Sequence, residues 1–226
     1  MNSCSIANKH LLATILIATL GLQLAACGGG SGSSGGGQGA RILHASLDSA
    51  PFNLTISDRP DQPVLFARFG LPTSYAATPK GEHILTATST LGGSTFSFAV
   101  PAGHPTRQSI LIYGSRGISG LKATLLADEP GGIPPNSSAL RLINGAEDLK
   151  ALSASAGGTN IAQNLPLGGA SAYTFVVSGA LEIVAQEYQN APFYRDTHEL
   201  LPGKSYTVLV AGESRLMVTT RVLEDG

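Results

Sequence analysis

Cysteine and charge are both scarce in this chain. Its 226 residues include two cysteines, Cys4 and Cys27, and the long remainder after Cys27 has none. A body without cysteine excludes disulfide bonds, a thiol nucleophile and a thiolate zinc site. Charged residues make up 13%, and the net charge is −1. No stretch interleaves basic and aromatic residues as nucleic-acid binding requires, so we expect no nucleic-acid partner.

Motifs for catalysis and for metal or cofactor binding are also missing. No serine lies in a Gly-x-Ser-x-Gly motif. The histidines after Cys27 are His44, His83, His104 and His198. No two of them have the i, i+2 or i, i+4 spacing of metal ligands. Four acidic pairs are predicted to lie in solvated turns or at the terminus: Asp58/Asp61, Asp128/Glu129, Glu147/Asp148 and Glu224/Asp225. The sequence therefore predicts a protein that is not an enzyme and that binds no metal or cofactor.

One constellation, His44 with Ser46 and Asp48, has the residue types of a hydrolase triad. On a strand the three side chains would point the same way about 6–7 Å apart, beyond the roughly 2.6–3.2 Å that proton transfer needs. We expect instead that Asp48 and Ser49 cap a turn before Pro51, and that His44 bonds to the backbone at a strand end. A hydrolase of extracellular polymers is the least favoured function class.

An apolar run precedes Cys27. Lys9 and His10 are followed by Leu11–Ala26, in which only Thr and Gln are polar interruptions. The run is shorter than the about 20 residues of a membrane span but has the length of a signal-peptide core. Its end, Leu24-Ala25-Ala26-Cys27, resembles the lipobox of bacterial lipoproteins. The resemblance implies cleavage before Cys27 and acylation of its thiol and of the new amino group.

This resemblance also implies a location. One fatty chain binds a membrane only marginally, whereas two or three make the attachment effectively permanent. Gly28 follows the cysteine, and the sorting rule of Gram-negative lipoproteins then favours the outer membrane, because no aspartate retains the protein at the inner one. We therefore expect residues 1–26 to be a lipoprotein signal peptide and Cys27 to be the lipidation site. An ordinary secretory leader with an incidental cysteine is the alternative.

The segment after Cys27 is almost entirely glycine and serine. Gly28–Gly39 contains eight glycines, three serines and one glutamine. Such a segment buries no apolar surface, so we expect it to be disordered. Its expected span is roughly 20 Å. Residues 27–39 are thus predicted to be a lipidated cysteine followed by a flexible tether.

Residue patterns recur after the tether at an offset of 98 to 100 positions. Arg41–Ser46 (RILHAS) matches Arg141–Ala146 (RLINGA), and Ile110–Gly114 (ILIYG) matches Val208–Gly212 (VLVAG). Between them, Tyr75 matches Tyr173 and Gly81 matches Gly179. The offset predicts two tandem copies, residues 40–130 and 139–226, with a seam in the turn-rich Asp128–Ser138. Each copy is expected to fold alone, although the short seam leaves open that the two pack as one body.

Each copy has the texture of a β-protein. The strands expected in the first copy are 40–45, 53–57, 64–69, 83–89, 95–100, 109–113 and 121–127. Those expected in the second are 139–143, 160–165, 173–177, 181–186, 205–210 and 217–223. About seven short strands in a hundred residues predict an all-β fold of two tandem immunoglobulin-like antiparallel β-sandwich domains. Helical periodicity is confined to the vicinity of Glu147–Ala151.

Two pairs of repeated residues have expected roles in this fold. Gly81 and Gly179 are predicted to take positive φ in hairpins. Tyr75 and Tyr173 are expected to bury their rings while each hydroxyl finds a partner. Stacking of these two rings on a sugar is the alternative.

The first copy resembles a known family. The residues that carry the resemblance are Arg41–Ile56 (RILHASLDSAPFNLTI), Phe69-Gly70, Ser74-Tyr75 and Gly81, and they look like the family called domain of unknown function 4397. The second copy is similar in outline at Leu167-Gly168, Ser171–Tyr173, Gly179 and Pro202–Gly212. The resemblance implies a secreted or surface-anchored protein with no assigned activity. Because Asn144 stands in the place of His44, a function that depended on His44 would not extend to the second copy.

One loop has the composition of an interface. Tyr188–Arg195 holds three aromatic residues and one arginine, residue types that are enriched at binding surfaces. The candidate binding residues are Tyr188, Phe193, Tyr194 and Arg195, and rings tucked into the core are the alternative.

The leading hypothesis is a non-enzymatic, lipid-anchored protein of the cell envelope. It would display two β-sandwich modules to bind a surface partner, either an envelope protein or an extracellular glycan, or serve as a structural spacer. A periplasm-facing accessory lipoprotein that assists an envelope assembly is the runner-up.

Overall fold

The regular structure of the described part of the chain consists of β-strands. The computed structural model describes residues 38–59, 65–104, 107–188, 190–214 and 216–225. These residues belong to one unit, Ser34–Gly226, and every regular element within them is a strand. No helix long and apolar enough to cross a membrane occurs among them. The predicted signal peptide, Cys27 and the tether before Gln38 lie outside the described residues.

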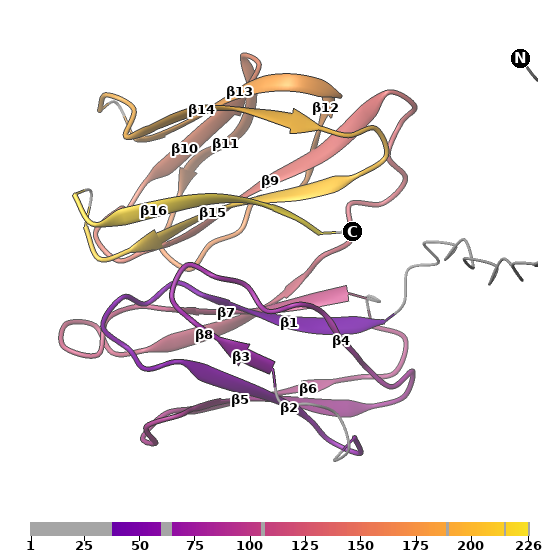
Figure 1. The fold of residues 1–226 in the computed structure, drawn as a ribbon, viewed down its shortest axis with the longest axis vertical. Coiled ribbons are helices and arrows are strands. Elements are labelled where there is room, and N and C mark those ends of the chain that lie inside the picture. Colours follow the sequence, from indigo (N-terminus) through magenta and orange to yellow (C-terminus); the bar gives the residue numbers. More distant parts are fainter. Residues whose placement is uncertain (1–37, 60–64, 105–106, 189, 215, 226) are drawn as a thin grey trace, which may run out of the picture. The chain divides into compact units, whose positions relative to one another are not determined.

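The two halves of the described chain have the same topology, strand for strand (Figure 1). The first half contains β1 (Gly39–His44), β2 (Phe52–Ile56), β3 (Leu65–Ala67), β4 (Ala76–Ala77), β5 (His83–Ser89), β6 (Thr95–Val100), β7 (Arg107–Tyr113) and β8 (Lys122–Ala127). Its two sheets have the orders β4-β1-β7-β8 and β3-β2-β5-β6.

The second half contains β9 (Ser137–Ala146), β10 (Leu152–Ala156), β11 (Thr159–Leu165), β12 (Thr174–Val177), β13 (Gly179–Glu187), β14 (Tyr194–Leu200), β15 (Ser205–Gly212) and β16 (Val218–Glu224). Its sheets have the orders β12-β9-β15-β16 and β11-β10-β13-β14. The all-β fold predicted from the sequence is therefore confirmed.

Each half has a buried core between its two sheets. In the first half, Ile42 of β1 and Ile110 of β7 belong to one cluster with Phe52 of β2 and Leu85 of β5. The corresponding cluster of the second half includes Leu142, Val208, Leu152 and Ile183. Each core thus takes side chains from both sheets of its own half.

A third buried cluster joins the two halves. It combines Leu43 of β1 and Leu111 of β7 with Ile143 of β9 and Leu209 of β15. We call the two sheets that carry these strands, β4-β1-β7-β8 and β12-β9-β15-β16, the inner sheets, and the other two the outer sheets (Figure 1). The two halves therefore pack against each other, which the sequence alone left open.

The central strands of the inner sheets are buried on both faces. Every residue of β1 and of β15 is buried. Because neighbouring side chains of a strand point to opposite faces, Ile42 belongs to the core of its own half while Leu43 belongs to the cluster between the halves. Burial on both faces explains why the matching segments of the two copies are nearly continuous apolar runs.

The inner sheets are not purely antiparallel, and this corrects the prediction from the sequence. β1 pairs in parallel with β7, with Ile42 opposite Ile110, and β9 pairs in parallel with β15, with Leu142 opposite Val208. The first and seventh strands of each half are adjacent in its inner sheet, although four strands of the outer sheet come between them in the chain. The periodicity of a strand carries no information about the direction of its neighbour, so the sequence could not reveal these pairs.

Most strands lie close to their predicted positions, and β5 and β6 have the predicted ends. The prediction missed β4, β10 and β14. Glu147 and Asp148 form a turn where the helical periodicity was noted. Gly179 has the predicted positive φ, 123°, but it lies in no hairpin, because β12 and β13 belong to different sheets. The prediction was wrong for Gly81, which does not adopt positive φ.

Gly145 of β9 lies where the two halves approach each other closely. A Cβ atom added at Gly145 would be 2.3 Å from the Cβ of Ala45 in the first half and 3.2 Å from the carbonyl oxygen of Val210. The backbone amide of Gly212 also donates a hydrogen bond of 3.2 Å to the carbonyl of Ala45. The absence of a side chain at position 145 therefore allows this contact between the halves.

Gly145→Ala is expected to lower the free energy of unfolding by about 1–3 kcal/mol, because the added methyl group forces the inner sheets apart. Urea denaturation of the purified protein measures this loss. Gly132→Ala is the matched control, since no atom lies within 4 Å of a Cβ added there. Equal stability of the two variants would contradict the close approach at Gly145.

Candidate functional site

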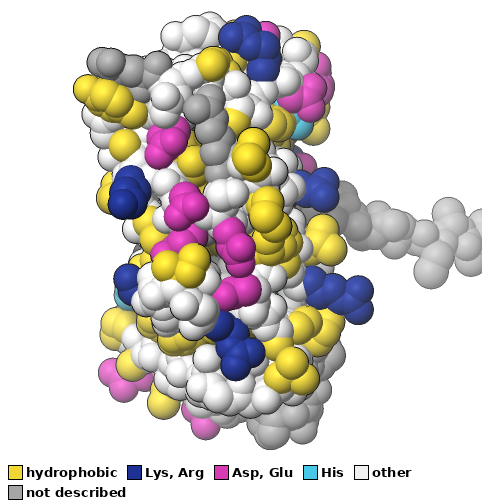
Figure 2. Space-filling model, turned by 90° about the vertical axis from the view of Figure 1, so that its left-hand side faces the viewer, with side chains coloured by type: hydrophobic (Ala, Val, Ile, Leu, Met, Phe, Trp, Pro, Cys, Tyr) yellow, Lys and Arg dark blue, Asp and Glu magenta, His cyan; other side chains and the backbone are white. Residues whose placement is uncertain are grey.

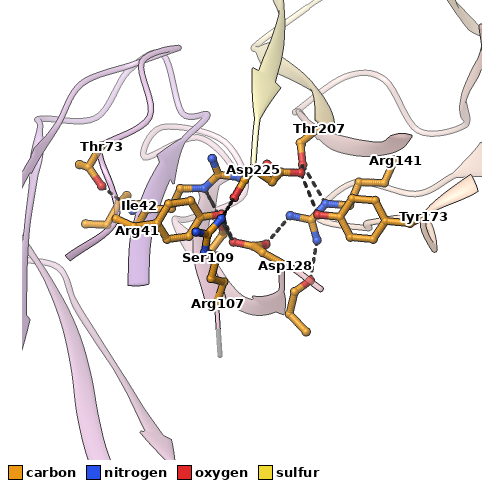
Figure 3. Close-up of polar contacts among 12 residues, drawn as sticks. Arg41, Ile42, Thr73, Arg107, Ser109, Asp128, Arg141, Tyr173, Thr207 and Asp225 are labelled. Atoms are coloured by element: carbon orange, nitrogen blue, oxygen red, sulfur yellow. Dashed lines mark hydrogen bonds and ion pairs between the residues drawn. The ribbon is translucent and has the colours of Figure 1, made fainter. Parts of the chain in front are cut away.

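Four buried charged side chains meet between the inner sheets (Figure 3). Arg41 lies on β1 and Arg141 on β9, while Asp128 directly follows β8 and Asp225 directly follows β16. None of the four is more than 3% exposed. Arg41 forms an ion pair with Asp225, and Arg141 forms one with Asp128. Each arginine therefore pairs with the aspartate of the other half.

The first half positions Asp128 through two hydroxyl groups. The Tyr75 hydroxyl donates a hydrogen bond of 2.7 Å to Oδ2 of Asp128, and Ser109 Oγ donates one of 2.5 Å to the same oxygen. Ser109 Oγ also accepts a hydrogen bond of 2.8 Å from Nε of Arg41. The guanidinium carbon of Arg41 lies 4.6 Å from the centre of the Tyr75 ring, a cation–π distance.

The second half repeats this arrangement around Asp225. Its Oδ2 accepts hydrogen bonds of 2.8 Å from the Tyr173 hydroxyl and of 2.8 Å from Thr207 Oγ1. Thr207 Oγ1 also accepts a hydrogen bond of 2.8 Å from Nε of Arg141. The Arg141 guanidinium carbon lies 4.7 Å from the centre of the Tyr173 ring. Each hydroxyl has the partner that was predicted for it, and each tyrosine is half-buried rather than fully buried.

The pKa values of three residues in this cluster are raised. Burial, reinforced by Asp128 and Asp225, raises the pKa of Tyr75 and of Tyr173, so both hydroxyls stay protonated and donate. Burial by itself would lower the pKa of Arg141, but the adjacent acidic groups, Asp128 foremost, outweigh burial and raise the pKa. Two arginines and two aspartates thus form two ion pairs that are almost entirely buried. We call Arg41, Asp128, Arg141 and Asp225 the charge lock, because the two ion pairs join the two halves.

The sequence-based prediction for Asp128 and Asp225 was wrong. Both were expected in solvated turns or at the terminus, and both are buried, whereas their neighbours Glu129 and Glu224 are exposed. Glu147 was also predicted to be solvated and is only 9% exposed. A signal did exist in the sequence: the arginine, the tyrosine, the hydroxyl residue and the aspartate all recur in both copies.

His44, Ser46 and Asp48 do not form a triad. Strand β1 ends at His44 and the chain then turns, so Ser46 Oγ donates a hydrogen bond of 3.0 Å to Asp48 rather than standing about 6–7 Å away. Nε2 of His44 donates to the carbonyl of Ala50 at 3.0 Å and lies 3.1 Å from Ser49 Oγ. The backbone hydrogen bond predicted for His44 is confirmed, and full burial of His44 keeps substrate away from its ring.

Asp48 caps a different turn from the predicted one. Its carboxylate accepts hydrogen bonds from Ser115 Oγ at 2.7 Å and from the backbone amides of Arg116 at 2.9 Å and Gly117 at 3.1 Å. Desolvation alone would raise the pKa of Asp48, but these hydrogen bonds and that of Ser46 outweigh it and lower the pKa to about 2. Asp48 therefore anchors the loop after β7, which sequence proximity could not indicate.

Asn144 performs in the second half the task of His44 in the first. Its Nδ2 donates to the carbonyl of Leu149 and, at 3.1 Å, to that of Leu165. The two side chains occupy matching positions in β1 and β9, and each forms a hydrogen bond to a backbone carbonyl of the segment that follows its strand. The two copies thus use different side chains for the same structural contact.

The four candidate binding residues divide between two environments. Phe193 and Tyr194 pack against the core of the second half, and the Tyr194 hydroxyl lies 2.5 Å from Nε2 of His198. Tyr188 is 55% exposed in the turn after β13. Arg195 forms an exposed ion pair of 2.8 Å with Glu182. Tyr194 and Arg195 belong to strand β14 rather than to a loop, which corrects the prediction that all four form one binding loop.

Within the described ranges, no group of three His, Cys, Asp or Glu side chains is placed to hold a metal ion. The chain matches no protein-family model and no curated protein. The resemblances noted in the sequence therefore stay predictions, and the geometry above is the basis for proposing a function.

Asp225→Asn is expected to lower the free energy of unfolding by about 3–5 kcal/mol, because it leaves the buried charge of Arg41 without its partner. Chemical denaturation of the purified protein measures the loss. The adjacent Glu224→Gln is the control: Glu224 pairs with Lys204 at 2.8 Å on the exposed surface, and such pairs contribute about 1 kcal/mol or less. A loss for Asp225→Asn no larger than that of the control would show that the lock is not structural.

His44 should make folding sensitive to weak acid. Burial lowers the pKa of His44 in the folded protein, despite its hydrogen bond to Ala50. Below the ordinary value of about 6.5 the unfolded chain therefore takes up the proton more readily. The stability contributed by neutral His44 is full above that value and is lost as the pH falls through the lower pKa of the folded state. His44→Asn, which introduces the residue that the second copy has at Asn144, should flatten the decline in unfolding free energy between about pH 7 and pH 5. An unchanged slope would contradict the assignment.

Proposed function

We propose that the chain is a non-enzymatic, lipid-anchored protein of the cell envelope that displays two immunoglobulin-like β-sandwich repeats as one rigid body. The observation that carries this proposal is the reciprocal pairing of Arg41 with Asp225 and of Arg141 with Asp128. A module that binds a partner, or holds it at a set distance from the membrane, needs its two repeats in a fixed relative position. Buried, fully paired charges supply such a geometry, because any relative movement of the halves would separate them.

The distribution of polar groups supports a binding or spacing role over catalysis. The hydroxyls of Ser109 and Thr207 donate to the carboxylates of Asp128 and Asp225, and His44 is buried away from solvent. On the face drawn in Figure 2, several acidic side chains gather at mid-height, and the basic side chains are scattered and form no continuous basic patch. Such a surface suits a neutral or mixed partner better than a polyanion.

The lipidation of Cys27 and the tether after it are the parts of the proposal that come from the sequence, although Gly39, which was assigned to the tether, belongs to strand β1. The resemblance to the lipobox favours the outer membrane of a Gram-negative bacterium. The described body begins at Gln38, with Gly39 already paired in strand β1 opposite Arg107 of β7. The tether would therefore lead directly into the inner sheet of the first repeat.

Cys27→Ser tests the anchor. The variant is expected to move from the membrane fraction to the soluble fraction of lysed cells, because the thiol that carries the lipid is lost. Immunoblotting of the two fractions measures the shift. Cys4→Ser is the matched control and should stay in the membrane fraction, and a membrane-bound Cys27→Ser protein would overturn the lipid anchor.

Protease treatment of intact cells tests which side of the outer membrane the body occupies. Display on the surface predicts digestion of the body without lysis. Protection until the outer membrane is opened would favour the accessory lipoprotein that faces the periplasm.

A further inference from the structure

A groove of about 400 Å³ crosses the outer sheet of the second half, over β10, β11 and β13. Its volume lies in the range of small-molecule binding sites. Four carboxamide side chains line it: Asn160, Gln163, Asn164 and Gln186. None of its lining residues carries a charge.

The other lining residues are two serines, one tyrosine and the apolar Ala154 and Val184. Ser153 and Ser155 of β10 line the groove together with Tyr188, whose side chain is 55% exposed. A carboxamide offers both donors and an acceptor, and a serine hydroxyl both donates and accepts. The aromatic ring adds a flat apolar face with a polar tip.

Two register shifts shape the groove. The pairing of β10 with β11 shifts between Leu152 and Ala154 and again between Ala154 and Ser155. The corresponding pairing of β2 with β3 in the first half has a continuous register over its three described pairs, with Asn53 opposite Phe66. Bulges change the direction in which the side chains of a strand point. The carboxamide side chains of β11 therefore line the groove in the second half.

The backbone of the groove is strained and held in place. Asn164 has a φ of 53° and Tyr188 a φ of 43°, which makes them two of the four non-glycine residues with positive φ in the described ranges. For a bulky residue such as Tyr188 this conformation is a true outlier. The backbone amide of Asn164 donates a hydrogen bond of 3.1 Å to Ser153 Oγ, and Nε2 of Gln186 donates one of 3.1 Å to the backbone carbonyl of Tyr188. Strain that neighbouring groups maintain is typical of binding sites.

We propose that this groove binds a neutral saccharide. Each sugar hydroxyl both donates and accepts, which matches carboxamides and serine hydroxyls, and the apolar face of a sugar ring packs on an aromatic ring such as that of Tyr188. A charged ligand would find no opposite charge among the lining residues. The inference deepens the proposed function and rests on it, because an extracellular glycan is one of the two partners expected for a displayed module.

The test uses the full chain in detergent micelles and a panel of neutral hexasaccharides of glucose, mannose, xylose or galactose, with hexagalacturonate as the charged comparison. Isothermal titration calorimetry measures binding. At least one neutral hexasaccharide is expected to bind more tightly than hexagalacturonate. Tyr188→Ala should weaken that binding by about tenfold, the equivalent of the stacking contribution of one ring.

Gln163→Ala provides a second variant in case Tyr188→Ala disturbs the fold, because Gln163 is exposed on β11. It should weaken binding while leaving the melting temperature unchanged. Phe66→Ala is the matched control, since Phe66 is a 46% exposed aromatic residue on β3, the strand that corresponds to β11. Its binding should equal that of the unaltered protein.

Three results would overturn the saccharide site: no neutral hexasaccharide binds, hexagalacturonate binds best, or Tyr188→Ala and Gln163→Ala bind as the control does. These outcomes are separable from failure of the proposed function. If no saccharide binds but membrane fractionation depends on Cys27, the saccharide site is wrong and the anchored module stands. If a saccharide binds in the groove but fractionation does not depend on Cys27, the lipid anchor is wrong and the saccharide site stands.

Discussion

The exchange of charged partners between the two halves is the constraint on which the rest of the structure depends. An ion taken out of water costs several kcal/mol unless an opposite charge and hydrogen bonds compensate it. Arg41 finds its closest opposite charge on Asp225, while Asp128 of its own half lies at 3.8 Å from its Nε. Neither half can therefore bury its arginine with full compensation unless the other half is in place.

This constraint makes the contact between the halves specific as well as apolar. An apolar surface alone tolerates sliding, because the free energy gained depends mainly on the area that is removed from water. Two ion pairs related by the repeat fix both position and direction. The cluster of Leu43, Leu111, Ile143 and Leu209 then packs beside them in a single arrangement. The missing side chain of Gly145 serves the same contact, because it lets the inner sheets come close enough for the charges to meet.

The sequence predicted what depends on local pattern. Most strand positions, the hydroxyl partners of Tyr75 and Tyr173 and the backbone hydrogen bond of His44 follow from alternation and side-chain chemistry, and the structure confirms them. The parallel pairs of the inner sheets and the shifted register of β11 could not be predicted, and the only sequence signal for the burial of Asp128 was the recurrence of its set of partners in both copies. Each of these features depends on which distant segment of the chain lies alongside. The residues around Asp128 have the composition of a solvated turn, but Asp128 is buried because Arg141 of the other half pairs with it.

The position of the repeat within the structure explains why the candidate binding site lies in an outer sheet. The segments that match between the copies, such as Arg41–Ser46 with Arg141–Ala146, lie mainly on the inner sheets. Their side chains must serve a core on one face and the partner half on the other, so few residue types fit. The exposed face of an outer sheet touches neither the cluster between the halves nor the charge lock. Residues there change at little cost in stability, as on most protein surfaces. The second half can therefore carry the bulged, amide-lined face of β11 while the first half keeps a regular β3, with both built on one scaffold.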